Sequence, residues 1–151
     1  MASAITLATT VNAAPERIFE ALSTSAGLSS FWTGDSRAEP KLGSIAVFGF
    51  GPTRLEMRVD ALESGRRVAW TCMNDFPMEP HCWPGTTVAW ELTEQQGGQT
   101  AVLLEHGGWP DSLEQRGVAS TAFTWARILQ ALKDYLESGV PRPVFPQHVA
   151  L

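Results

Sequence analysis

The stretch that decides the fold is LEQRGVASTAFTWARILQALKDYLE, residues Leu113 to Glu137. It contains no proline, and Gly117 is its only glycine, so little in it opposes a helix. Its apolar residues recur every three or four positions: Val118, Ala122, Trp125, Leu129, Leu132 and Leu136. This spacing predicts one long amphipathic helix with an apolar stripe that packs against the rest of the protein.

The residues before this helix alternate between apolar and polar side chains. From about Ser44 to His106 the pattern indicates five short strands, and Ile5 to Val11 adds an earlier one. The alternation is clearest at 54–61, where four side chains are expected to point inward: Leu55, Met57, Val59 and Ala61.

The fold class that follows is α+β, with a curved antiparallel sheet of about six strands wrapped around the long helix. Two short helices, at 15–22 and 23–31, are expected after the first strand, and 33–43 is expected to be a loop. A sheet curled around one helix tends to leave a cavity between them. The sequence therefore predicts a container, built as a single domain over 1–151 with a proline-rich tail at about 139–151.

Composition limits the partners and the compartment. The formal net charge of −5 argues against nucleic acid or an anionic membrane as the main partner. No segment approaches the ~20 consecutive apolar residues of a membrane span, and the first residues lack a secretory signal. Two cysteines, Cys72 and Cys82, do not make a disulfide framework. A cytoplasmic protein without membrane insertion is expected.

One long connection stands out between two predicted strands. Met73 to Gly85 is longer than an ordinary hairpin loop, and long loops are often binding elements. It carries Phe76, Met78 and Trp83, which would be costly to leave in water. The loop is therefore predicted to fold over the mouth of the cavity.

Large aromatic side chains are the best candidates to line that cavity, because they give apolar walls and, in tryptophan, one N–H for orientation. For Trp70 and Trp90, filling the core is an equally good interpretation. The residues predicted to bind a ligand are Trp32, Phe48, Phe50, Met57, Trp70, Trp83, Trp90, His106, Trp109, Val118, Ala122 and Trp125.

His106 is the polar member of this set, in phase with the inward residues of the last strand. It is expected either to be a hydrogen-bonded core residue or to orient a ligand. Together with Cys72, His81 and Cys82 it could be drawn as a metal site, but the spacing fits no usual zinc pattern. No metal, no cofactor and no catalytic residue is predicted.

Five segments carry a resemblance to a known family. They are Val11 to Leu22 (VNAAPERIFEAL), Leu28 to Trp32 with its aromatic pair, Trp83 to Val88 (WPGTTV), Glu105 to Trp109 (EHGGW), and the tail Gly139 to Phe145. With them the chain resembles the START/polyketide cyclase/Bet v I-like (SRPBCC) superfamily. Within it, the chain resembles the bacterial branch named after the activator of heat-shock-chaperone (Hsp90) ATPase. The resemblance implies the helix-grip fold.

The resemblance implies several functions rather than one. The superfamily includes lipid carriers, hormone receptors, cyclases, dehydratases and co-chaperone domains, and its catalytic members share no motif that could be carried over. The leading hypothesis is an intracellular binding module for a small hydrophobic or aromatic molecule. The alternatives are a cyclase- or dehydratase-type enzyme, with His106 moving a proton, and an interaction domain acting on a chaperone ATPase. A homodimer is a plausible assembly for this branch.

Overall fold

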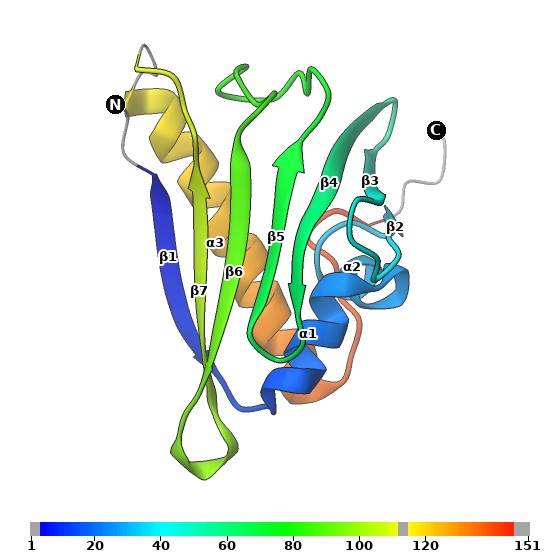
Figure 1. The fold of residues 1–151 in the computed structure, drawn as a ribbon, viewed down its shortest axis with the longest axis vertical. Coiled ribbons are helices and arrows are strands. Elements are labelled where there is room, and N and C mark those ends of the chain that lie inside the picture. The colour runs from blue at the N-terminus through cyan, green and yellow to red at the C-terminus, as the bar shows by residue number, and fades with distance from the viewer. Residues whose placement is uncertain (1–3, 112–114, 147–151) are drawn as a thin grey trace.

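The computed structural model describes residues 4–111 and 115–146. Its elements follow the chain as β1 (Ile5–Val11), α1 (Pro15–Ser23), α2 (Ser25–Phe31), β2 (Asp35–Arg37), β3 (Ile45–Phe50), β4 (Thr53–Glu63), β5 (Arg67–Cys72), β6 (Thr87–Glu94), the short 3₁₀ turn η1 (Gln96–Gly98), β7 (Thr100–Gly107) and α3 (Gln115–Ser138). The strands pair antiparallel in the order β1-β7-β6-β5-β4-β3-β2. In Figure 1 the sheet faces the viewer and α3 crosses behind it. The predicted α+β helix-grip architecture is confirmed.

Within the described residues the sheet has seven strands, one more than predicted. The additional strand is β2, which lies inside the segment 33–43 that was expected to be a loop. It pairs with Val47 to Gly49 of β3 at the edge of the sheet. Three residues are too few to show an apolar alternation, so only the backbone pairing reveals this strand.

The alternation in β4 places Leu55, Met57 and Val59 in the core, as predicted. The prediction for Ala61 is wrong. Val59 and Ala61 pair with consecutive residues of β5, so Asp60 is the extra residue of a β-bulge. Beyond the bulge the faces exchange. Ala61 therefore lies on the outer face, and Leu62 packs against the core in its place.

The predicted apolar stripe of α3 is confirmed. Trp125, Leu129, Leu132 and Leu136 are buried, whereas Val118 and Ala122 are half-buried and pack against the core. The helix ends at Ser138, and Gly139 follows it with a φ of +76° that suits glycine and an N–H that donates to Tyr135 O at 2.8 Å. Leu113 and Glu114, which the predicted helix included, lie outside the described residues. Neither α3 nor any other described helix combines the length and apolarity needed to cross a membrane.

Two short helices, α1 and α2, pack closely against each other. Pro15 opens α1, where its missing N–H leaves no helical bond unmade. Thr24 caps α2 by accepting a hydrogen bond from Gly27 N at 3.1 Å. A Cβ on Gly27 would lie 2.4 Å from the Cα of Ala21, so only glycine permits this close contact between the helices.

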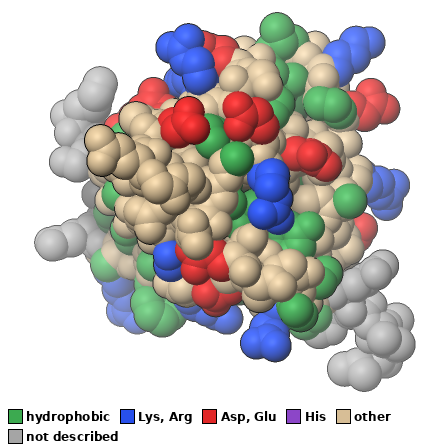
Figure 2. All heavy atoms as spheres, turned by 90° about the horizontal axis from the view of Figure 1, so that it is seen from below, with side chains coloured by type: hydrophobic (Ala, Val, Ile, Leu, Met, Phe, Trp, Pro, Cys, Tyr) green, Lys and Arg blue, Asp and Glu red, His purple; other side chains and the backbone are tan. Residues whose placement is uncertain are grey.

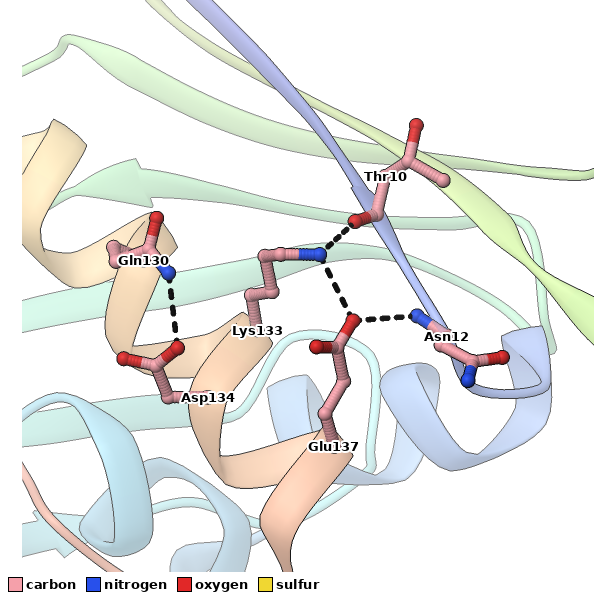
Figure 3. A network of polar contacts seen from close by, with 6 residues as sticks. All are labelled: Thr10, Asn12, Gln130, Lys133, Asp134 and Glu137. Carbon is pink, nitrogen blue, oxygen red and sulfur yellow. Dashed lines mark hydrogen bonds and ion pairs between the residues drawn. The ribbon is translucent and has the colours of Figure 1, made fainter.

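The C-terminal end of α3 is tied to the junction between β1 and α1 (Figure 3). Lys133 Nζ donates to Thr10 O at 2.6 Å and to Glu137 Oε2 at 2.9 Å. The same carboxylate oxygen accepts from Asn12 N at 2.8 Å. The hydrogen bond from the Asn12 N–H, helped by the Lys133 ammonium, lowers the pKa of Glu137 below its usual value. We call these four residues the helix latch.

The tail after α3 returns along α2 instead of leaving the molecule. Its backbone donates from Val144 N to Phe31 O at 3.1 Å and from Phe145 N to Trp32 O at 2.8 Å. Phe145 also forms a parallel bridge with Thr33. These bonds place the ring of Phe145 beside β3, where it packs edge-on against Phe50 with 5.1 Å between the centroids.

Candidate ligand pocket

A mostly apolar pocket of about 160 Å³ lies between the N-terminal half of α3, the loop 73–85 and the tail. It is at the end of the sheet where the connection between β5 and β6 lies, the upper end in Figure 1. Its described lining is Trp32, Phe50, Leu55, Phe76, Met78, Glu79, Trp83, Ser120, Thr121, Thr124, Trp125, Ile128 and Phe145. A cavity bordered by the sheet and α3, as predicted, is therefore present at this end.

Five aromatic rings of the lining form a closed circuit. Around it, the centroid distances are 6.3 Å from Trp32 to Phe50, 5.5 Å from Phe50 to Phe76, and 5.0 Å from Phe76 to Trp83. The circuit closes through 6.5 Å from Trp83 to Trp125 and 5.2 Å from Trp125 to Trp32. We call these five residues the aromatic circuit.

The loop 73–85 folds over the pocket, as predicted, and bonds to α3. The carbonyl oxygen of Glu79 accepts from Trp83 Nε1 at 3.0 Å. The hydroxyl of Thr121 lies 3.2 Å from the same oxygen and donates within its own helix to Gly117 O at 2.8 Å. Phe76 and Trp83 of the loop are buried, while Met78 is about half exposed at 47 %. The loop is therefore part of the pocket wall and of the core together.

His106 lies behind this wall, fully buried, with both ring nitrogens hydrogen-bonded. An indole N–H can only donate, so Nδ1 accepts from Trp125 Nε1 at 3.0 Å. Nε2 must then carry the proton and donate to Thr86 Oγ1 at 2.9 Å, and Thr86 in turn donates to Trp83 O at 2.7 Å. Burial lowers the pKa of His106 from 6.5 to about 3, so the ring is neutral at physiological pH.

The pocket brings together four of the twelve predicted ligand residues: Trp32, Phe50, Trp83 and Trp125. The other eight lie elsewhere. Phe48, Met57, Trp70 and Trp90 are buried in the core. His106 lies behind the pocket wall, where Trp109 packs on it with 4.1 Å between the centroids, and Val118 and Ala122 pack against the core. The core-filling interpretation of Trp70 and Trp90 matches where the structure places them.

Several lining residues were not predicted from sequence. Ser120, Thr121, Thr124 and Ile128 lie on α3 at the same helical spacing as Trp125, so the helical period could have identified them. Phe145 was hidden in the proline-rich tail, and only the backbone bonds of that tail bring it to the pocket. For the residues on α3, the available signal was a stripe of hydroxyl side chains next to the apolar stripe of the same helix.

Within the described residues no group of three His, Cys, Asp or Glu side chains is placed to hold a metal ion. Cys72 is buried, and its thiol donates to Asn74 O at 3.3 Å. Burial raises the pKa of the Cys72 thiol, which keeps it protonated and unreactive at neutral pH.

A second hollow lies at the opposite end of the molecule and is of a different kind. It lies between the start of α1 and the turn joining β4 to β5, and charged side chains of both signs line it, among them Glu16, Glu63, Arg66 and Arg67. Figure 2 shows this end from below, with acidic, basic and hydrophobic side chains interspersed over it. Mixed charges on an open surface do not define a ligand, so the apolar pocket is the candidate site.

Known proteins show the same fold. The family model of the Activator of Hsp90 ATPase homolog 1-like proteins matches residues 12–137. The Aha1 dimer from Colwellia psychrerythraea, a solution structure, is 31 % identical with a TM-score of 0.78 over 91 % of this chain and 98 % of that chain. Protein MLL2253 from Mesorhizobium loti is 17 % identical, with a TM-score of 0.76 over 89 % of this chain and 97 % of that chain.

A further similar structure comes from a biosynthetic locus. DynU16, from the dynemicin biosynthetic locus, is 21 % identical with a TM-score of 0.77 and covers 97 % of this chain but 52 % of its own. At identities this low the likeness shows the fold alone. No curated protein matches the sequence. The family match spans most of the chain, and the chain therefore belongs to the Activator of Hsp90 ATPase homolog 1-like family.

Proposed function

We propose that this protein binds a small apolar or aromatic molecule in the pocket between the sheet, α3 and the loop 73–85. One observation supports this above all: aromatic and aliphatic side chains wall a partly open space of about 160 Å³. Apolar walls in contact with water are unfavourable, and a ligand that covers them recovers this free energy.

The size of the pocket limits the ligand. An apolar protein cavity of about 150 Å³ holds benzene, so this pocket suits one aromatic ring or a short branched chain. The hydroxyls of Ser120 and Thr124 on the lining offer a polar group of the ligand a hydrogen-bond partner.

The enzyme alternative gains less support. His106 has no free ring nitrogen with which to exchange a proton, because Trp125 and Thr86 occupy both. Among the described lining residues, only Glu79 has a titratable side chain. General acid–base catalysis needs a titratable group within hydrogen-bond reach of the reacting atom, so we propose a binding role.

Filling the pocket tests this proposal. Thr124 is half-buried on the lining, and Ala126 lies two residues further along α3 on its exposed surface. Thr124→Phe places a ring in the pocket, whereas Ala126→Phe adds the same ring to the solvent side. Titration calorimetry with benzene and with indole should give saturable one-to-one binding to the wild type and to Ala126→Phe. In Thr124→Phe the new ring occupies the ligand's place, so the affinity should fall at least about tenfold, which corresponds to a loss of ~1.4 kcal/mol of binding free energy.

Two results would contradict the binding role. The first is that neither compound binds the wild type, in which case the interaction-domain alternative would be preferred. The second is that Thr124→Phe binds as the wild type does, which would place the compounds at another site. Far-ultraviolet circular dichroism of both variants verifies that α3 is intact.

We also infer a homodimer. The Aha1 relative that shares 31 % of its residues with this chain was solved as a dimer. Leu42, three residues before β3, and Ile45, the first residue of β3, are 60 % and 44 % exposed and give apolar surface to such a contact. Sedimentation equilibrium should return twice the mass of one chain, and a single-chain mass at high protein concentration would contradict the dimer.

A further inference from the structure

The aromatic circuit has the dimensions of a cage for a positively charged group. A regular ring of five centroids 5.0 to 6.5 Å apart has a radius of about 5 Å, and a cation attracts an aromatic ring within ~6 Å of its centroid. A cation at the centre of the circuit would therefore be within reach of all five rings.

Neighbouring rings of the circuit are inclined to one another rather than stacked flat. The angles between neighbouring planes are 37° to 82°. Two indole N–H groups, which form the positive edges of their rings, are bonded to protein acceptors: Trp83 to Glu79 O and Trp125 to His106 Nδ1. The most positive edge of each of these two indoles is therefore occupied within the protein, and a cation would interact with them through their faces.

The charges around the pocket have one sign. Glu79 is the only charged residue of its described lining. An adjoining hollow shares Phe50, Met78 and Phe145 with the pocket, and the only charged residue among its described lining is Asp35. No lysine, arginine or histidine lines either space in the described part of the chain. The pocket therefore attracts cations and has no counter-charge for an anion.

We propose that the ligand of this pocket carries a small alkylated ammonium group, held inside the aromatic circuit with the Glu79 carboxylate near the mouth. This rests on the proposed function and names its ligand class. A quaternary ammonium bearing methyl groups is similar in size to benzene, and so fits the pocket volume. Its methyl groups keep apolar contact with the walls while its charge interacts with the rings.

An isosteric pair of probes separates charge from shape. Choline and 3,3-dimethyl-1-butanol have the same branched shape, but only choline is charged. Titration of the wild type should give choline an affinity about tenfold higher than its neutral isostere, as expected of cation–π contacts in a desolvated site. Choline binding should also weaken as salt concentration rises, because Glu79 is exposed to solvent.

The matched variants are Glu79→Gln and Glu105→Gln. Both remove one exposed carboxylate, but Glu105 lies on β7, outside the pocket lining. Glu79→Gln should reduce the choline affinity about two- to fivefold and leave the alcohol unchanged, consistent with a partly screened charge pair. Glu105→Gln should leave both affinities unchanged.

The outcomes distinguish this inference from the proposed function. If 3,3-dimethyl-1-butanol or indole binds as tightly as choline or more tightly, the cation preference is wrong while the binding module stands. If none of these three compounds binds and benzene does not bind either, both are wrong. If Glu105→Gln weakens choline as much as Glu79→Gln does, the attraction comes from net charge and the assigned role of Glu79 is wrong.

Discussion

At the scale of the residue, His106 is the side chain whose surroundings matter most. It faces inward, as predicted, but it lies behind the pocket wall. Its ring links Trp125 of α3 to Thr86, the residue before β6, through two hydrogen bonds. A buried polar group that is fully bonded stabilises one arrangement of the core, because moving it would leave its partners unpaired. Its role in this structure is to position Trp125 and Trp83.

The low pKa of His106 predicts how stability changes with pH. The native ring has a pKa of about 3, while an unfolded histidine has one near ~6.5. Between these values the unfolded chain binds a proton that the native protein excludes. The stability that depends on the neutral ring is therefore complete above pH ~6.5 and is lost as the pH falls toward 3.

The measurement compares urea denaturation of the wild type and His106→Gln at several values between pH 7 and pH 4. The difference in unfolding free energy between the two proteins should shrink by up to about 1.4 kcal/mol for each pH unit below 6. Carboxylates common to both proteins cancel in this difference. Parallel profiles for the two proteins would show that His106 does not carry this pH dependence.

At the scale of the element, α3 contributes to both the core and the pocket, and Trp125 belongs to both. The stripe that the apolar residues define packs on the sheet, and the neighbouring stripe with Thr121, Thr124 and Ile128 lines the pocket. At its far end the helix latch fixes α3 to the beginning of the chain through Lys133 and Glu137 (Figure 3). These hydrogen bonds join the end of the first strand to the end of the last helix, so they hold the two ends of the fold together.

The helix latch predicts a modest stability loss for Glu137→Gln. The side chains of Lys133 and Glu137 are 30 % and 33 % exposed, so solvent screens the pair and the cost should be about 0.5–1 kcal/mol at pH 7. Because its native pKa is lowered, the contribution of Glu137 is present above the usual carboxyl pKa and is lost as the pH falls through the lowered value.

Asp134→Asn is the matched control for this variant. Asp134 accepts from Gln130 within α3 at 2.9 Å and therefore supports the helix only locally. Urea denaturation at pH 7 should show a smaller loss for Asp134→Asn than for Glu137→Gln. If both variants lose the same unfolding free energy, the hydrogen bonds between Glu137, Asn12 and Lys133 stabilise the protein no more than a local side-chain pair on the surface of α3 does.

At the scale of the whole molecule, the tryptophans form one connected cluster. Trp32, Trp70, Trp90 and Trp125 contact in sequence, at 5.9, 6.1 and 5.9 Å between centroids, and Trp83 joins Trp125 to Trp109. The cluster lies between the sheet and α3, and three of its members, Trp32, Trp83 and Trp125, border the pocket under the loop 73–85. The sheet, α3 and the loop therefore share one core.

A shared core predicts a single cooperative unfolding transition. Tryptophan fluorescence reports the aromatic cluster, and far-ultraviolet circular dichroism reports the helices and the sheet. The two signals should give the same urea midpoint and the same slope, as in two-state domains of about this size. Two separate midpoints would contradict the prediction that residues 1–151 form one domain.

The amino-acid sequence by itself determined the periodic features of this protein. The stripe of α3, the inward residues of β4 before its bulge, and the long apolar loop follow from local spacing, because burial on one face imposes the period of the element on the sequence. These features were sufficient for an antiparallel sheet curled around one long helix, with the loop over one end, and the family resemblance added the helix-grip fold.

Only the tertiary structure decided which aromatic residues border the pocket. Trp70 and Trp125 are both buried among other rings, and they differ in that Trp125 also borders the pocket. Phe145 reaches that space through backbone bonds of the tail, and Ala61 left the core through a one-residue bulge. Such differences arise between elements distant in the chain, so no local pattern records them.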